Sequence, residues 1–199
     1  MIFINHRVNS INKLMNTSKE FGVEVDLRSY NKKIYLHHEP FRKGEFLKDW
    51  IKYYDHKMLI LNVKEEGLEK SIIKILKKNK IRNFFFHDQT FSTLLKNMHK
   101  TNVSIRYSEY EDIKKRNYLF KRIKWLWLDN FTHIELGKKF YNYLKHKRIK
   151  ICMVSPELIK KKRQNEIKRT ISSFKKKGII IDAVCTKKPR LWKRLLNEK

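Results

Sequence analysis

Two carboxylates that could work as a pair lie on one short extended run of the chain. Residues 23–28 alternate apolar and charged side chains, and neighbouring side chains of a strand point to opposite faces, so Glu24 and Asp26 share a face. Two close carboxylates cannot both stay ionised cheaply unless a cation lies between them. A turn-prone segment, 30–32, follows, and the next extended run ends at His38. The pattern is typical of a metal-assisted acid–base site, although Glu24 and Asp26 alone could also form a solvated face of an edge strand.

Polar side chains also end the other predicted strands. Oxygen ligands of this kind suit Mg²⁺ or Ca²⁺, and the cations Arg7, Lys64 and Arg106 suit a phosphate group. We therefore expect a site for one divalent cation and a phosphate. Besides the pair above, the set consists of His6, Arg7, Asn62, Lys64, His87, Asp88, Arg106, Glu109, Asp129, Ser155, Glu157, Thr186 and Lys187.

The elements that must position these residues alternate between strand and helix along the chain. Eight strand patterns occur, at 1–8, 23–28, 57–64, 83–88, 103–109, 123–129, 149–155 and 179–186. This alternation predicts a mainly parallel sheet, and eight units fit a compact (β/α)₈ barrel with a β-hairpin excursion after strand 2. A doubly wound open sheet would need a glycine-rich loop after its first strand, where this chain has His6 and Arg7. We expect one domain over residues 1–199.

Several helix boundaries can be predicted from capping residues. Ser10 and Thr90 are expected N-caps, and Gly178 is expected to end a helix over 164–177. Pro40 is expected to begin a helix that carries the apolar positions 46–54. Further helices are predicted over 110–122 and 134–147. Trp125 and Trp127 are interpreted as packing residues, and the His87-Asp88 pair mostly as a loop or surface feature.

The net charge is +28, from 48 lysine and arginine against 20 aspartate and glutamate residues. Such a charge is typical of proteins that bind anionic polymers or a membrane surface, but the basic residues run along the whole chain, which favours a solvated surface. Cys152 and Cys185 match no metal spacing and are expected to be reduced core residues. The amino-terminal segment lacks the pattern of a signal peptide, and no apolar run is long enough for a membrane span. A cytoplasmic protein with no obligate protein partner is expected.

These residues resemble the glycerophosphodiester phosphodiesterase and phosphatidylinositol-specific phospholipase C superfamily. The resemblance is carried by His6-Arg7 after the first strand, by Glu24-Val25-Asp26 on the second, and by His38-Glu39 after the hairpin. Asn62-Val63-Lys64 matches the family's Glu-x-Lys in part, and Thr186-Lys187-Lys188-Pro189 matches its last-strand signature in part. The matches cover the first sixty-odd positions and the final strand, while the middle of the chain matches by strand order.

The resemblance implies a barrel-shaped phosphoric diester hydrolase of lipid metabolism, acting on a glycerophosphodiester or a related sugar or polyol phosphodiester. His6 would be the general base and His38 the general acid, with the reverse assignment left open. Glu24, Asp26 and Asn62 would hold one Mg²⁺ or Ca²⁺, which polarises a phosphoryl oxygen. Arg7, Lys64 and Arg106 would neutralise the phosphate. Whether the reaction passes through a cyclic phosphodiester also stays open.

Three positions depart from the family's pattern. Asn62 stands where a carboxylate is usual, and its amide oxygen is a weaker ligand than a carboxylate. Val8 replaces a glycine, and Lys187 replaces an acid. The alternative hypothesis is therefore a catalytically impaired barrel that serves as a basic module for polyanions or nucleic acid. Peripheral attachment to anionic lipid is a third possibility, which would require an apolar rim.

Overall fold

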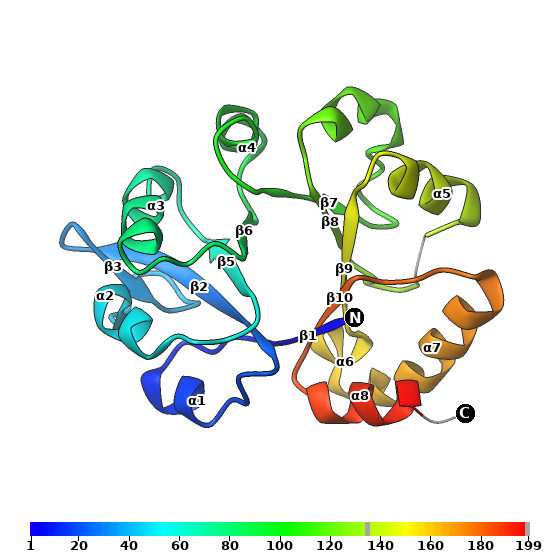
Figure 1. Ribbon diagram of the computed structural model, residues 1–199, viewed down its shortest axis with the longest axis horizontal. Coiled ribbons are helices and arrows are strands. Elements are labelled where there is room, and N and C mark those ends of the chain that lie inside the picture. The colour runs from blue at the N-terminus through cyan, green and yellow to red at the C-terminus, as the bar shows by residue number, and fades with distance from the viewer. Residues whose placement is uncertain (134–135, 198–199) are drawn as a thin grey trace. The chain divides into compact units, whose positions relative to one another are not determined.

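The computed structural model describes residues 1–133 and 136–197, except for the side chains of 115–117 (Figure 1). It is an α/β protein, as the alternating strands and helices predict, and its sheet is mixed. The backbone falls into two compact units, one made of residues 5–103 and the other of residues 1–4 with 104–199.

The unit of residues 5–103 is built around the long strand β2. Strand β5 pairs with β2 in parallel and β6 pairs with β5 in parallel, while β3 pairs with β2 and β4 with β3 in antiparallel fashion. Helices α3 and α4 follow β5 and β6, so this unit contains two of the predicted strand–helix repeats. Its elements are α1 (Ile11–Met15), β2 (Gly22–Tyr30), β3 (Lys33–Leu36), β4 (Glu45–Phe46), α2 (Leu47–Trp50), the 3-10 helix η1 (Ile51–Tyr53), β5 (Leu59–Val63), α3 (Glu69–Lys78), β6 (Phe84–His87) and α4 (Phe91–Asn97).

In the second unit the strands β10, β9, β8 and β7 lie in this order, and each neighbouring pair of them is parallel. Its first residues belong to β1 (Ile2–Asn5), where the amide of Ile2 donates to the carbonyl of Asp182. The other elements are β7 (Ser104–Tyr107), η2 (Lys114–Lys121), β8 (Trp125–Leu128), α5 (Lys138–His146), β9 (Lys150–Val154), α6 (Pro156–Ile159), η3 (Lys161–Asn165), α7 (Glu166–Lys177), β10 (Ala183–Thr186) and α8 (Pro189–Asn197).

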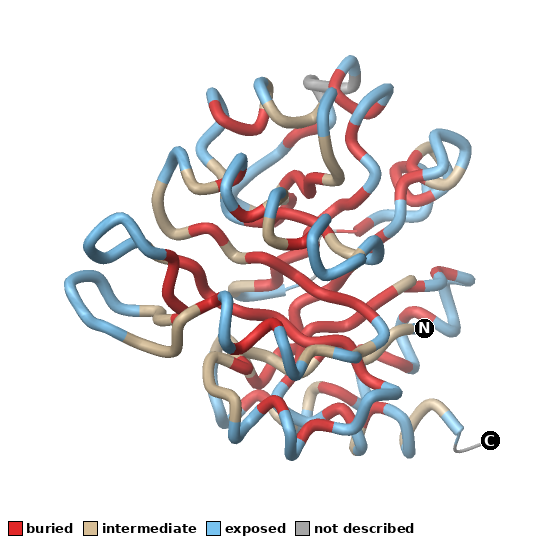
Figure 2. The backbone as a smooth tube through the Cα atoms, turned by 60° about the vertical axis from the view of Figure 1, so that its left-hand side comes forward, coloured by how far each residue is buried: buried red, intermediate tan, exposed pale blue. Residues whose placement is uncertain are grey.

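The strands form the core of each unit, and the turns carry the exposed positions (Figure 2). Strand β8 is buried along its whole length, and Trp125 and Trp127 are buried as expected for packing residues. Cys152 and Cys185 are buried thiols on β9 and β10, which agrees with the prediction of reduced core residues. Apolar burial on strands with helices against them is the main source of stability in such units.

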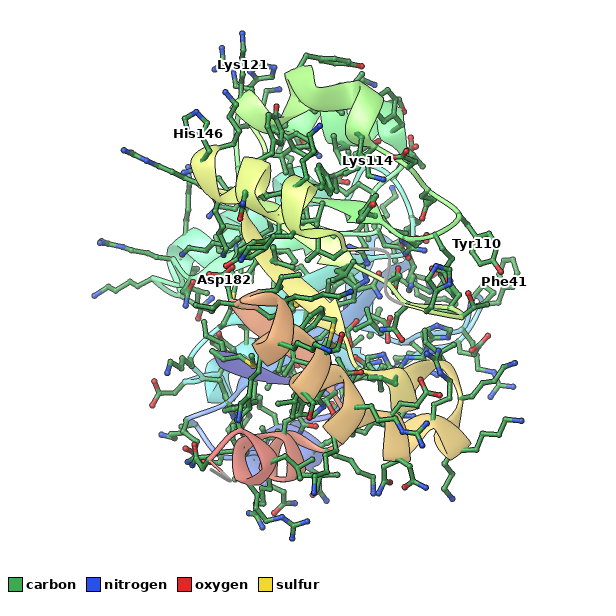
Figure 3. The ribbon with its side chains drawn as sticks, turned by 90° about the vertical axis from the view of Figure 1, so that its right-hand side faces the viewer. Phe41, Tyr110, Lys114, Lys121, His146 and Asp182 are labelled. Atoms are coloured by element: carbon green, nitrogen blue, oxygen red, sulfur yellow. The ribbon has the colours of Figure 1, made fainter. Side chains whose placement is uncertain are left out.

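Two carboxylates tie the second unit together beyond its apolar core. The carboxylate of Asp182, labelled in Figure 3, accepts from Lys145 Nζ at 2.6 Å and from the amide of Ile151 at 2.8 Å. Buried Glu157 accepts from the hydroxyl of Thr186 and from the amide of Lys187 at 3.2 Å. These carboxylates join neighbouring strand ends, so we assign them a structural role.

The capping predictions are confirmed by the backbone. The Ser10 side chain accepts from the amide of Lys13 at the start of α1, and Thr90 accepts from Thr93 at the start of α4. Gly178 ends α7 with φ 60°, a left-handed conformation that favours glycine because it has no Cβ. The helix predicted over 134–147 is observed as α5, while its expected beginning, 134–135, lies outside the described residues.

The helix predicted from Pro40 is wrong. Residues 45–46 form strand β4, which pairs with β3, and the α-helical part is limited to Leu47–Trp50. Gly44 explains the difference, because an added Cβ there would lie 2.0 Å from the carbonyl oxygen of Leu36. This close packing holds residues 44–46 against β3, so the helix begins only at Leu47. The pattern at 110–122 likewise forms a 3-10 helix, η2, instead of an α-helix.

None of the helices within the described ranges combines the length and apolar character that crossing a bilayer requires. The division into two compact units does not test the expectation of a single domain over 1–199, which stays a prediction.

Candidate active site

Glu24 and Asp26 lie on one face of β2, as the alternation predicts, and both are almost completely buried. The carboxylates are thus removed from water and held by the strand at a fixed spacing of two residues. A solvated edge-strand face, the alternative interpretation, does not fit side chains that are 1% and 0% exposed. Burial of two acids together is costly unless other groups compensate it, so their surroundings decide what the pair can do.

Asn62 lies directly across from Asp26 in the parallel pair of β2 and β5. Its side-chain Nδ2 donates to Glu24 Oε1 at 3.0 Å and to Asp26 Oδ1 at 3.2 Å. The Oδ1 atom of the same amide is buried without a hydrogen-bond partner in the described part of the protein. Asn62 therefore joins the two acids, as expected for a third member of their set.

His87 continues the same row of residues, because β6 places it next to Asn62. The side chain is 3% exposed, so its interpretation as a loop or surface residue was wrong. The final position of a four-residue strand looks like a turn in the sequence, and the register with β5 shows that it is not. The row across the sheet consists of Asp26, Asn62 and His87.

The His6-Arg7 segment reaches the acids from the end of β1. The amide of Arg7 donates to Glu24 Oε2 at 2.7 Å, and His6 Nε2 lies 3.9 Å from the same oxygen. Arg7 Nε lies 3.7 Å from Asp26 Oδ2. Arg7 has a φ of 52°, so the chain turns sharply at the residue whose amide binds the carboxylate. Two residues far from β2 in sequence thus converge on Glu24 and Asp26.

Asn9 is a site residue that the sequence reasoning missed. Its Nδ2 donates to Asp26 Oδ2 at 2.9 Å, and its Oδ1 accepts from the Asp26 amide at 3.0 Å. These two bonds fix both the backbone and the side chain of Asp26. The signal in the sequence was weak, because an asparagine between Val8 and Ser10 has the composition of an ordinary loop.

Lys64 lies at the end of β5 with its Nζ 3.8 Å from Asp26 Oδ1 and 2.8 Å from Asp88 Oδ2. Its side chain is only 16% exposed, so this cation offsets part of the negative charge of the buried acids.

The two adjacent histidines have different surroundings. His38 is about one-third exposed; its Nδ1 lies 2.6 Å from Glu39 Oε1, and its carbonyl accepts from Arg28 Nε at 2.9 Å. No hydrogen bond or ion pair within described residues 5–103 joins His38 to Glu24 or Asp26. His37 donates its amide to the carbonyl of Asp26 at 3.1 Å.

An open hollow of about 480 Å³ lies beside the acids, and its wall includes Arg7, Asn9, Lys13, His37 and Glu45. Arg7 and Asn9 are the two side chains that also contact Asp26. The hollow therefore gives a ligand access to the groups around the carboxylates.

Burial is the main cause of an unusual acidity at this site. Burial, and then the negative charge of Asp26, raise the pKa of Glu24 from 4.5 to about 7. Hydrogen bonds from Arg7 and Asn62 and the charge of Lys64 act in the opposite direction. A carboxyl group whose pKa lies near neutrality releases its proton to solvent readily when a cation enters the site and binds the carboxylate.

The donor set fits a hard divalent cation. Two buried carboxylates each accept a hydrogen bond from the Nδ2 of one amide, and the oxygen of that amide lacks a hydrogen-bond partner in the described part of the protein. Carboxylate and amide oxygens are the ligands that Mg²⁺ and Ca²⁺ prefer. Among the described residues no group of three histidine, cysteine, aspartate or glutamate side chains is arranged to hold a metal, because the third member here is asparagine.

Arg106 belongs to the other unit, on β7. Its Nε lies 3.3 Å from Asp129 Oδ2 and 3.6 Å from Glu111 Oε2. The guanidinium is 31% exposed, so it is accessible to an anion, but two carboxylates in its own unit already balance its charge.

Comparison with known proteins finds matches to the fold of this chain but not to its sequence. No family sequence model matches the chain, and no curated protein matches it by sequence. Among solved structures, a glycerophosphodiester phosphodiesterase from Thermotoga maritima matches with a TM-score of 0.74 and 19% identity over 98% of each chain. The chain therefore has the fold of a glycerophosphodiester phosphodiesterase, as the resemblance of its motifs predicts.

Two further solved structures support this assignment of the fold. A phosphodiesterase from Oleispira antarctica, in complex with the product sn-glycerol-3-phosphate, matches with a TM-score of 0.70 and 14% identity over 100% of this chain and 97% of the other. A putative glycerophosphoryl diester phosphodiesterase from Agrobacterium tumefaciens matches with a TM-score of 0.68 and 11% identity, over 100% and 98%.

Proposed function

We propose that the protein is a metal-dependent phosphoric diester hydrolase that acts on a glycerophosphodiester or a related polyol phosphodiester. The observation that carries the proposal is the convergence of three segments, in which the Arg7 amide and the Asn62 side chain both donate to buried Glu24. The fold shared with glycerophosphodiester phosphodiesterases supports the same activity. A compact (β/α)₈ barrel, in which strand ends gather functional residues at one face, forms part of this proposal.

Glu24, Asp26 and Asn62 are the residues that would hold the divalent cation. When bound, the cation supplies charge that polarises a non-bridging phosphoryl oxygen. Asn9 keeps the Asp26 carboxylate in a fixed orientation through its two hydrogen bonds. The Asn62 amide contributes no charge, so the site carries one negative charge fewer than three carboxylates would give, and the cation is bound more weakly.

Proton transfer is assigned to His6 and His38. The His6 imidazole takes the proton of the attacking hydroxyl or water, and His38 gives a proton to the oxygen that leaves phosphorus. Glu24 lies 3.9 Å from His6 Nε2, where a carboxylate stabilises the imidazolium formed by proton uptake. Glu39 contacts His38 Nδ1 and orients that ring in the same way.

Arg7 and Lys64 are assigned to the phosphate, and a phosphate role for Arg106, which lies on β7 of the other unit, stays a prediction. Arg7 lines the hollow beside the acids, and Lys64 lies at the edge of the carboxylate pair. A guanidinium and an ammonium at this distance from the acids can neutralise the remaining phosphoryl charge. The proposed protein is cytoplasmic and acts on a small phosphodiester without an obligate protein partner.

The test is hydrolysis of a panel of phosphodiesters, including glycerophosphocholine and glycerophosphoinositol, with Mg²⁺, with Ca²⁺ and with a chelator. We expect turnover with a divalent cation and none with the chelator. His6→Ala should lower kcat roughly 100-fold to 10,000-fold, the usual contribution of general acid–base catalysis. His99→Ala, at an exposed histidine of the same unit, is the matched control and should leave the rate unchanged. Activity that survives His6→Ala, His38→Ala and Glu24→Ala would overturn the mechanism.

A further inference from the structure

The loop between β3 and β4, residues 37–44, is a hairpin loop with a firmly held base. Strands β3 and β4 pair through Leu36 and Glu45. Gly44 packs against the Leu36 backbone so closely that no side chain fits there, and Arg28 Nε holds the His38 carbonyl at 2.9 Å. The loop therefore presents its tip in a defined position.

Phe41 lies at this tip with its side chain in solvent. It is 98% exposed, more than any other large hydrophobic residue among those described, and it stands out from the protein surface in Figure 3. Its φ of 58° is rare for a residue that carries a Cβ. A fully exposed phenylalanine held in a strained conformation on a short loop indicates that the ring is kept for a contact outside the unit.

The surroundings of Phe41 are strongly basic. Residues 28–48 carry six lysine or arginine side chains against two carboxylates, Glu39 and Glu45. The ammonium groups of Lys33 and Lys48 lie 5.7 and 6.0 Å from the centroid of the Phe46 ring, and Lys43 lies 6.0 Å from that of Tyr35. Because Tyr35 and Phe46 are paired neighbours on β3 and β4, these three cations gather on one surface.

The arrangement of aromatic rings favours a lipid bilayer over a nucleic acid. Binding of single-stranded nucleic acid relies on open aromatic faces for successive bases. Tyr35 is buried, and lysines lie over the Tyr35 and Phe46 rings, so neither offers such a face. One apolar ring that projects from a basic surface instead suits the surface of a bilayer. There, basic side chains bind the anionic headgroup phosphates and an apolar ring can enter the layer beneath them.

We infer that the Phe41 loop and the basic surface of Lys33, Lys43 and Lys48 dock onto an anionic phospholipid bilayer, with Phe41 entering its apolar layer. This inference rests on the proposed function and specifies its substrate class as phosphodiesters of lipids held in a membrane. His38, the proposed acid, is three residues from Phe41 on the same loop, and Gly44 and Glu45 also line the hollow beside Arg7. Docking of this loop would therefore bring headgroups to the site.

The first experiment measures co-sedimentation of the full chain with vesicles of phosphatidylcholine, with and without phosphatidylglycerol. We expect the protein to bind the anionic vesicles. Phe41→Ser should weaken this binding about ten-fold or more, because the variant loses the free energy gained when the phenylalanine ring moves from water into the bilayer. Tyr53→Ser, at a half-exposed aromatic residue elsewhere in the same unit, is the matched control and should bind as the unchanged protein does. Equal binding by all three proteins would overturn the inference.

A pair of double charge reversals separates a local surface from the general charge of +28. Arg42→Glu with Lys43→Glu should weaken vesicle binding by roughly five-fold or more for each reversed residue. Lys70→Glu with Lys74→Glu, at exposed positions of α3, changes the net charge equally and should have a much smaller effect. Equal losses of vesicle binding in the two double variants would show a diffuse attraction by the net charge and would overturn the proposal. Phe41-dependent binding to an RNA oligonucleotide, without binding to vesicles, would show a different partner and would also overturn it.

Hydrolysis distinguishes failure of docking from failure of the proposed function. Phe41→Ser should hydrolyse soluble glycerophosphocholine at the unchanged rate, while its rate on lysophosphatidylcholine in anionic vesicles should fall about as far as its binding. No hydrolysis of either substrate, with Phe41-dependent vesicle binding intact, would remove the proposed activity and leave docking supported. Equal rates for the two proteins on the vesicle substrate would remove the inference and leave the activity supported.

Discussion

Asn62 Nδ2 lies 3.2 Å from Asp26 Oδ1, across the parallel pair of β2 and β5. The amide thus occupies the place where the family pattern has a third acid, and it serves as a hydrogen-bond donor to two carboxylates. These two hydrogen bonds give each buried carboxylate a partner, so the acids are partly compensated even when no cation is bound. With asparagine here, the set has one negative charge fewer than three acids would give. Under the proposed function this would weaken cation binding, while the two hydrogen bonds stabilise the metal-free protein.

Asn62→Asp should therefore reverse that balance. We expect the variant to bind Ca²⁺ or Mg²⁺ about ten-fold more tightly, since a charged ligand replaces a neutral one. Without metal it should unfold more easily, because three carboxylates then share one buried place. Calorimetric titration and thermal unfolding measure the two effects. Asn12→Asp, at an exposed position of α1, is the control, and unchanged metal affinity in Asn62→Asp would argue against this cation site.

His37 and His38 are adjacent, and replacing each by alanine separates their roles. His38→Ala should lower kcat by about 100-fold or more, because it removes the proposed general acid. His37→Ala should stay within about ten-fold, since the His37 contact with Asp26 is made by its backbone amide, which alanine keeps. Steady-state kinetics on a soluble phosphodiester measure both. The opposite order of effects would transfer the acid role to His37, which lines the hollow.

Asn9 should act as a positioning residue for Asp26. Asn9→Ala removes two hydrogen bonds to this buried acid and should destabilise the protein by about 1–3 kcal/mol. It should also raise the metal concentration needed for half-maximal activity, with little change in kcat at saturating metal. Urea unfolding and activity at a series of metal concentrations provide the readouts. Asn12→Ala, which loses an exposed hydrogen bond, is the matched control; a metal requirement that matches the control would leave Asn9 with a structural role alone.

The stability of the metal-free protein should depend on pH through Glu24. Its pKa is about 7 in the folded protein and 4.5 ordinarily, so the folded state holds the proton more tightly than the unfolded state does. The resulting contribution is fully present below pH 4.5 and is lost as pH rises through 7, in total about 3 kcal/mol.

Urea unfolding at pH 5 and pH 8 in the presence of a chelator tests this dependence, with Glu24→Gln as the comparison. The variant cannot titrate at this position, so its free energy of unfolding should fall less between the two pH values than that of the unchanged protein. Added metal should reduce the loss in the unchanged protein, because it stabilises the ionised carboxylate. Identical pH dependence in both proteins would exclude Glu24 as its source.

The sequence alone determined the local features of this protein. Alternation along β2 put Glu24 and Asp26 on one face, because a strand has a period of two whatever its neighbours are. Ser10, Thr90 and Gly178 set helix ends, because capping depends on the residue and on the few backbone groups beside it. The ordered His6-Arg7 and Glu24-x-Asp26 motifs pointed to the fold, which the solved structures support.

Only the tertiary structure decided which distant residues meet. The register of β2 with β5, and of β5 with β6, places Asp26, Asn62 and His87 in one row. A loop brings Asn9 to the side chain and to the backbone amide of Asp26. The exposure of Phe41 could not be predicted either, because the sequence pattern places it in a helix that begins at Pro40. In the structure, the pairing of β4 with β3 leaves Phe41 on a loop instead. Pairing between strands depends on hydrogen bonds and close packing among residues far apart in the chain. No periodicity within a single segment records those contacts.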